Sequence, residues 1–409
     1  MAHTKKRQVL HTLHHAAMAV LFNLFVFGIV AAQPAQAQTL QILHTFTGNG
    51  DGGEPFAGVT LDRAGNLYGT TSAGNVYKLT HHGSSWGLTN VYVFQGGTDG
   101  AEPYARVVFG PDGTLFGTTS AGGAHGAGTV FNLRPPATFC RTIQCPWSET
   151  VLYSFTGGSD GNGPQYGDLT FDAAGNIYGT TAYGGAGCSG FGGCGVVFEL
   201  SRSGGGWTES VVHQFAGPDG QTPYSGVIFD SAGNLYGTTT SGGDDGGGTA
   251  YKLTPSGSGW TETILHSFGA GNDGADPYGG LAMDQQGGLF GTTFFGGTED
   301  AGIAFELQPS GGSWSYSVLR NFDGEQGAFD TPTVDAAGNV YGTIFGGGSG
   351  GIGNVFKLTH GSGGWTYTDL HDFTGRDGVE PIGGVTLDSS GNIYGTTFYA
   401  VGEVWEITP

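Results

Sequence analysis

Acidic side chains are the groups in this sequence that could do chemistry. The 409 residues include 34 Asp and Glu against 13 Lys and Arg, which gives a net charge of −21. Two carboxylates at a suitable separation are enough to hydrolyse a glycosidic bond. Four acids that belong to no repeated motif are candidates for this role: Asp244, Asp245, Glu299 and Asp300. We favour the alternative that they are solvated loop charges.

The sequence lacks the other common catalytic patterns. It has no GxSxG nucleophile elbow, no HExxH zinc motif and no phosphate-binding P-loop. We therefore predict no catalytic residue apart from those four acids, and we lean towards a protein that is not an enzyme.

A recurring Asp-Gly-x-x-Pro segment could in principle hold calcium. Asp-Gly is a turn dipeptide, because Asp bonds the local backbone and Gly adopts positive φ. Calcium takes about six to eight oxygen ligands, and one Asp in each distant copy cannot supply them. We predict turns and no cofactor, with Ca²⁺ as the alternative. The copies begin at Asp51, Asp99, Asp160, Asp219, Asp273 and Asp377.

Four of the 12 histidines share one position in a repeat. They are His44, His213, His266 and His371, each two residues before a Phe. Other copies place Tyr92, Tyr153 and Arg320 at that position. A position that accepts His, Tyr and Arg is interpreted as a packing or strand-edge position, and a metal shared among these histidines is not expected.

Aromatic side chains offer a different chemistry, the recognition of a ligand. Aromatic lining with a few polar groups is typical of a small-molecule site. One set directly follows the prolines of the links: Phe56, Tyr104, Tyr224 and Tyr278. A second set follows the motif described next: Tyr183, Phe294, Phe295, Phe345, Phe398 and Tyr399. We predict that both sets line the mouth of a central channel and bind ligand; the alternative is that they only shield the core.

The element that must position these residues is a short stretch, GNLYGTT, that occurs seven times. Its copies lie at residues 65–71, 113–119, 175–181, 233–239, 287–293, 338–344 and 391–397. Self-similarity at a period of about 50 residues indicates a repeat architecture. Each copy is interpreted as a strand whose Tyr or Phe packs between repeats. Its Gly would make room for the neighbouring repeat's ring, and its Thr pair suits strand propensity.

Each repeat reads as four short strands separated by turn residues. In the fourth repeat they are expected at 225–230, 234–239, 249–254 and 260–268. Four strands per unit and seven units predict an all-β, seven-bladed β-propeller. The last repeat ends after its third strand, and an extra strand at about 38–46 precedes the first. We predict that this N-terminal strand joins the last, C-terminal blade and closes the ring, which removes an open sheet edge.

The N-terminus has the pattern of a secretory signal peptide. Lys5, Lys6 and Arg7 precede an apolar run, and the small-x-small sequence 35–37 precedes Gln38. We expect 1–37 to be removed and 38–409 to form a monomeric propeller without a membrane span. We expect this propeller to be secreted and to lie outside the cell, at the cell surface or in the periplasm. An uncleaved anchor is the alternative. The acidic surface disfavours nucleic acid, which binds Lys and Arg patches.

The four cysteines are expected to form two local disulfides in an oxidising compartment. Cys140 pairs with Cys145 and Cys188 with Cys194 in this interpretation, because each pair falls within one loop. A single tetrahedral metal site would need both pairs together, and they fall in different loops.

The repeated GNLYGTT, the DGxxP links and the GxVFxL third strand resemble the GloVer tandem repeats of Gloeobacter and Verrucomicrobia. They are also loosely similar to NHL-type propeller repeats. The resemblance covers essentially all of 38–409. It implies export and a cell-surface or extracellular location, and it implies no particular activity.

Taken together, the sequence favours a secreted binding or surface-interaction module that recognises a glycan or a cell-surface protein at its aromatic face. One alternative is an extracellular carbohydrate-active enzyme, a hydrolase or lyase that uses loop carboxylates. The other is a purely structural envelope protein.

Overall fold

The computed structural model describes residues 38–136, 147–188, 192–257, 259–269, 271–324, 326–399 and 401–409. The contacts divide the chain after Thr39, and the unit Leu40–Thr408 carries the fold. Its regular structure consists entirely of strands in the described ranges. Within those ranges, no helix is long and apolar enough to cross a membrane. The proposed signal peptide 1–37 lies outside the described residues.

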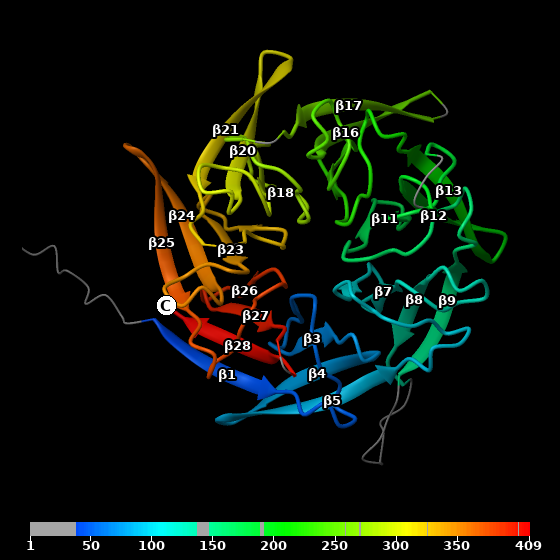
Figure 1. Ribbon diagram of the computed structural model, residues 1–409. Coiled ribbons are helices and arrows are strands. Elements are labelled where there is room, and N and C mark those ends of the chain that lie inside the picture. Colours follow the sequence, from blue (N-terminus) through cyan, green and yellow to red (C-terminus); the bar gives the residue numbers. More distant parts are fainter. Residues whose placement is uncertain are drawn as a thin grey trace, which may run out of the picture. The chain divides into compact units, whose positions relative to one another are not determined.

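Seven antiparallel sheets of four strands are arranged in a ring, so the fold is a seven-bladed β-propeller (Figure 1). Blade 1 consists of β2 (Thr60–Leu61), β3 (Leu67–Thr70), β4 (Asn75–His82) and β5 (Ser85–Val93). Blade 2 consists of β6 (Val108–Phe109), β7 (Leu115–Thr119), β8 (Thr129–Arg134) and β9 (Ser148–Ser154). Blade 3 consists of β10 (Thr170–Phe171), β11 (Ile177–Thr181), β12 (Val196–Ser203) and β13 (Gly206–Gln214).

Blades 4 to 7 repeat the pattern. They are β14 (Ile228–Phe229), β15 (Leu235–Thr239), β16 (Thr249–Ser256) and β17 (Gly259–Ser267); β18 (Ala282–Met283), β19 (Leu289–Thr292), β20 (Ile303–Ser310) and β21 (Ser313–Asn321); β22 (Thr333–Val334), β23 (Val340–Ile344), β24 (Asn354–Gly361) and β25 (Gly364–Asp372); and β26 (Thr386–Leu387), β27 (Ile393–Thr397), β28 (Glu403–Thr408) and β1 (Thr39–Thr45).

The predicted closure of the ring is confirmed. The last sheet has the order β1-β28-β27-β26, so the first strand of the chain lies beside the last one (Figure 1). The Phe46 amide donates to the Gly402 carbonyl at 3.0 Å, directly after β1. Phe46 is 1% exposed and packs against Tyr77 of the first blade, so β1 is also held by the neighbouring core.

The glycine of each GNLYGTT copy has a different role from the expected one. A Cβ on Gly237 would lie 2.4 Å from the hydroxyl oxygen of Tyr251, its cross-strand partner in the same blade. Gly69 faces Tyr77 and Gly395 faces Trp405 in the same way. The expectation that this Gly makes room for the neighbouring blade's ring was therefore wrong, because the ring comes from the third strand of the same blade.

The aromatic residue before that glycine does pack between blades, as predicted. Tyr68 contacts Phe109 and Trp147 of the next blade, with ring centroids 5.4 and 6.1 Å apart. Tyr178 likewise contacts Phe229 and Trp260. Because the Trp of each outer strand reaches the preceding blade, the aromatic residues join neighbouring sheets into one core.

The Thr residues of the motif do more than suit a strand. The first Thr of the pair donates its hydroxyl to a backbone carbonyl at the inner edge of the next blade. Thr238 reaches Gly279 at 2.8 Å, and the corresponding threonines 70, 180, 292, 343 and 396 reach Ala105, Ser225, Asp330, Pro381 and Ala57. Thr118 is the exception, since its buried hydroxyl has no partner. We call these bonds the interblade latches.

The Asp of each link is held by groups of its own blade junction. Asp219 accepts from the Ala216 amide at 2.8 Å and lies 3.0 Å from Nε2 of His213. Tyr153 donates to Asp160 at 2.9 Å in the same arrangement. The repeat position that holds His, Tyr or Arg therefore supplies a hydrogen-bond or ion-pair partner to the link Asp. This is a more specific role than the packing or strand-edge position predicted from the sequence.

The disulfide between Cys188 and Cys194 is present, with Cα atoms 5.5 Å apart. Cys140 and Cys145 lie outside the described residues, so their predicted pairing stays a prediction.

Candidate functional site

The innermost position of each blade forms a seven-membered ring of side chains. In every blade this position is the fifth residue before the last residue of the inner strand. Its members are Phe56, Tyr104, Tyr166, Tyr224, Tyr278, Phe329 and Ile382, so six of the seven are aromatic. The inner strands themselves are only two residues long, whereas the sequence predicted six for Ser225–Asp230. Among the preceding residues, Ser225 and Gly279 give their carbonyls to the interblade latches.

The aromatic members contact one another around this ring. Phe56 lies 4.9 Å from Tyr104, which lies 5.7 Å from Tyr166 between ring centroids. The series continues through Tyr224 to Tyr278, whose rings stack at 5.5 Å. Tyr278 then stacks on Phe329 at 4.4 Å. Six blades therefore contribute to one continuous aromatic surface.

Rings from the loops after the second strands extend this surface. Phe398 packs on Phe56 at 4.3 Å, and Phe294 packs on Phe329 at 4.8 Å. The aromatic cluster, as named here, consists of the six ring members with Tyr183, Phe294, Phe295, Phe345 and Phe398. Nine of the ten aromatic residues proposed from the sequence thus come together. Tyr399 does not, since it is 60% exposed and makes none of these ring contacts.

Sequence reasoning missed two members of the cluster, Tyr166 and Phe329. Neither residue directly follows a link proline, because blade 3 carries one additional residue after Pro164 and blade 6 has an irregular link. Counting backwards from the inner strand places both residues in register with Tyr224.

The tyrosine hydroxyls of the cluster are protonated donors at neutral pH. Burial, together with neighbouring tyrosines, raises the pKa of Tyr166 to about 12. Burial also raises the pKa of Tyr224, and its hydroxyl lies 2.8 Å from that of Tyr183. The site therefore offers hydroxyl groups as well as apolar ring faces.

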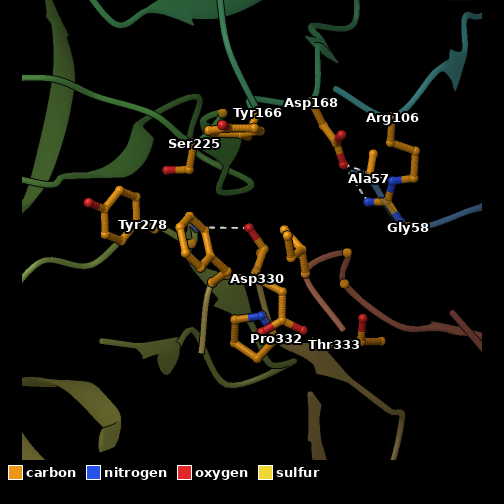
Figure 2. Close-up of a pocket in the computed structure, with 18 of the residues that line it drawn as sticks. Ala57, Gly58, Arg106, Tyr166, Asp168, Ser225, Tyr278, Asp330, Pro332 and Thr333 are labelled. Atoms are coloured by element: carbon orange, nitrogen blue, oxygen red, sulfur yellow. Dashed lines mark hydrogen bonds and ion pairs between the residues drawn. The ribbon is translucent and has the colours of Figure 1, made fainter. Parts of the chain in front are cut away.

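A cavity of about 290 Å³ opens at the centre of the blades. Six ring members, all except Tyr224, belong to its lining, together with the residues that follow them in each blade. Figure 2 shows Tyr166 and Tyr278 beside this cavity, with Arg106, Asp168 and Asp330 in the same lining. Because every blade contributes its innermost segment, the cavity lies in the central channel.

An ion pair crosses the wall of the channel. Arg106 Nε donates to Asp168 Oδ2 at 2.9 Å, and a second guanidinium nitrogen lies 2.5 Å from the same oxygen (Figure 2). The third reaches the Thr386 hydroxyl at 3.2 Å. Four of the other five blades have Gly at this repeat position, and blade 6 has Thr331. The pair therefore breaks the symmetry of the repeats and brings charge into the channel.

Asp330 is a second carboxyl in the wall, and it is 4% exposed. Its Oδ2 accepts from the Thr343 amide at 3.2 Å, whereas Oδ1 is buried without a hydrogen-bond partner. Burial raises the pKa of Asp330 to about 7. The sequence contained a signal for it, because the other blades have Ala, Gly or Ser at this position.

The four loop acids proposed from the sequence lie elsewhere. Asp244, Asp245, Glu299 and Asp300 are exposed and none lines the channel cavity. Asp300 Oδ1 accepts from the Gly296 amide at 2.9 Å, which is a turn contact. The carboxyls in the lining of the channel cavity are instead those of Asp168 and Asp330.

Solved structures with a similar fold are distant in sequence. The extracellular domain of a protein described as a hybrid two-component system from B. thetaiotaomicron matches with 10% identity and a TM-score of 0.53. The match covers 91% of this chain and 42% of that chain, so this chain spans less than half of that structure's length. This likeness concerns the fold alone.

Two further structures match with TM-scores of 0.45. One is a calcium structure of the Carbohydrate-Active Enzymes Family AA12 protein of Trichoderma reesei, with 12% identity over 91% of this chain and 96% of that chain. The other is the PQQ domain of a pyranose dehydrogenase from Coprinopsis cinerea, with 13% identity over 92% and 96%. No curated protein matches the sequence.

The sequence profile of the Gloeobacter/Verrucomicrobia repeat matches three overlapping segments, residues 28–191, 145–332 and 246–408. These segments cover nearly the whole propeller, in agreement with the seven GNLYGTT strands. The chain belongs to the Gloeobacter/Verrucomicrobia repeat family.

Proposed function

We propose that this protein is an exported binding module that recognises a saccharide at the aromatic cluster. The observation that carries the proposal is the continuous aromatic surface around the cavity of about 290 Å³. Sugar rings present apolar C–H faces and polar edges. A site with aromatic faces, tyrosine hydroxyls and the Arg106–Asp168 pair has groups for both.

The size of the cavity favours a small ligand or the end of a chain. Ligand pockets are commonly about 300–1,000 Å³, so this one is at the lower limit. One or two sugar units suit that volume better than a protein segment does. The Cys188–Cys194 disulfide supports an oxidising, extracytoplasmic location.

The test is a glycan-binding screen with the purified protein, followed by calorimetry with the best ligand. Replacing both Tyr224 and Tyr278 with Ala should weaken binding about tenfold or more, because a ring contact contributes about 0.5–1.5 kcal/mol. Tyr399→Ala is the matched control, since Tyr399 lies outside the cluster. Unchanged affinity in the double variant would contradict the site assignment.

A carbohydrate hydrolase is the second candidate, because two carboxyls with different environments line the channel. Asp168 is paired with Arg106, whereas the pKa of buried Asp330 is raised to about 7. Turnover of a bound saccharide that is lost in Asp168→Asn would favour this function over simple binding.

A further inference from the structure

The junction between blades 3 and 4 brings together three side chains that differ from those at every other junction. His213 is the second-last residue of β13, Asp219 lies in the link, and Glu262 belongs to β17 of the next blade. One ligand atom from each residue lies within 4.8 Å of the other two. Among the described residues, this is the one group in which three such atoms meet.

We propose that His213, Asp219 and Glu262 bind one divalent transition-metal ion, of the zinc class, that bridges blades 3 and 4. One imidazole and two carboxylates, with a fourth position for water, match the coordination that Zn²⁺ accepts in proteins. Calcium is a poorer match, because it takes oxygen ligands and about six to eight of them.

Two of the three ligands, His213 and Asp219, are already oriented by their neighbours. The His213 ring packs edge-on against Phe215 at 4.8 Å, which directs Nε2 towards Asp219 at 3.0 Å. The Asp219 carboxylate uses Oδ1 to accept from the Ala216 amide, so Oδ2 is the atom that faces His213. These two side chains therefore lose little conformational entropy when a metal binds.

Glu262 supplies the third side chain of the group. Its Oε1 is buried and has no hydrogen-bond partner, and Glu149 and Glu209 share this feature at the two preceding junctions, where Tyr takes the place of the histidine. A bound cation would give this oxygen a partner. This is the junction at which a histidine stands beside both carboxyls.

The other junctions act as natural comparisons because each lacks at least one of the three ligands. At the junction of blades 2 and 3, Tyr153 replaces the histidine beside Asp160 and Glu209. At the junction of blades 4 and 5, Tyr316 replaces the glutamate, and its ring stacks on His266 at 3.8 Å. The fold therefore accommodates Tyr at either position.

These substitutions define variants that should fold. His213→Tyr copies the junction of blades 2 and 3, and Glu262→Tyr copies that of blades 4 and 5. His266→Tyr is the matched control, because it makes the same change at a junction that has two of the three ligands.

The experiment titrates Zn²⁺ into untagged, chelator-treated protein and follows heat release, bound metal by elemental analysis and thermal unfolding. We expect one ion per chain, a higher unfolding temperature with metal, and dissociation constants at least tenfold weaker in His213→Tyr and Glu262→Tyr. His266→Tyr should bind as the original protein does. The absence of stoichiometric binding, or equal binding in all three variants, would overturn the proposal. Saccharide binding at the channel is measured separately, so failure of one proposal does not affect the other.

Discussion

Replacing Asp330 with asparagine should stabilise the protein increasingly as the pH rises from 5 to 8. The side chain is 4% exposed, and its pKa is raised from 3.8 to about 7. Each pKa unit corresponds to about 1.4 kcal/mol, so ionisation in the folded state is unfavourable by about 4 kcal/mol. Asparagine keeps the shape of the side chain and an oxygen that accepts from the Thr343 amide, but it cannot ionise.

The direction of this pH dependence follows from the different pKa values of Asp330 in the folded protein and in the unfolded chain. In the unfolded chain Asp330 ionises near pH 4, whereas in the folded protein it stays protonated until about pH 7. A raised pKa gives stability that is fully present below the unfolded value and is lost as the pH rises through the folded one. Between pH 5 and pH 8 the stability of the original protein should therefore fall by about 2–3 kcal/mol through this group alone.

Urea unfolding of both proteins at pH 5, 6, 7 and 8 measures this difference. Glu149, Glu209 and Glu262 also have raised pKa values, for which burial is the main cause, but they titrate in both proteins and cancel in the comparison. The difference in unfolding free energy should grow by about 2–3 kcal/mol in favour of Asp330→Asn.

Asp335→Asn in the same blade is the control. Although burial acts to raise it, hydrogen bonds from the Asn339 side chain and backbone hold the pKa of Asp335 below its usual value. That carboxylate is ionised in both states from pH 5 to 8, so its effect should not change with pH. A constant difference for Asp330→Asn as well would refute the raised pKa.

Two further variants test the framework. Thr238→Val should destabilise the protein by about 1–3 kcal/mol in urea unfolding, because it leaves the Gly279 carbonyl buried without its donor. Thr118→Val, at the position without a latch, should be nearly neutral, and equal effects would count against the latches. Phe46→Ala should lower the free energy of unfolding by about 3–5 kcal/mol, because the side chain is buried. It should also expose the amides of β28 to hydrogen exchange, because β1 is not continuous in sequence with the other strands of its blade. Full protection of β28 in that variant would contradict the closure.

The architecture could be predicted from the sequence because it depends on repetition. Seven copies of one strand fix the number of blades, and a missing outer strand at one end matches a surplus strand at the other. Such arguments need no knowledge of side-chain contacts. The same reasoning failed for Gly237, since choosing between the ring of its own blade and that of the neighbour requires the register of β15 on β16.

The site was only partly predictable for a related reason. Nine aromatic residues were found because they follow a motif, whereas Tyr166 and Phe329 follow irregular links. Arg106 and Asp168 come from different blades, so only the ring geometry brings them together. The group of His213, Asp219 and Glu262 likewise spans two repeats. Aligning repeats shows what the blades share and cannot show which residues meet across a junction.

Three irregularities of this propeller coincide at the junction of blades 2 and 3. Blade 3 carries the additional link residue after Pro164, and the latch that Thr118 would donate to it is absent. The Arg106–Asp168 pair joins the same two blades across the channel wall. An ion pair with two hydrogen bonds can hold the two blades together in place of the lost latch, yet a latch needs no charge and the six other junctions each have one. Arg106 and Asp168 line the cavity together with the aromatic cluster, whereas a neutral latch would provide no charged group for a ligand to bind. This coincidence favours the junction of blades 2 and 3 as the polar side of the binding site, and it predicts that the ligand's hydrogen-bonding edge points towards Arg106 and Asp168.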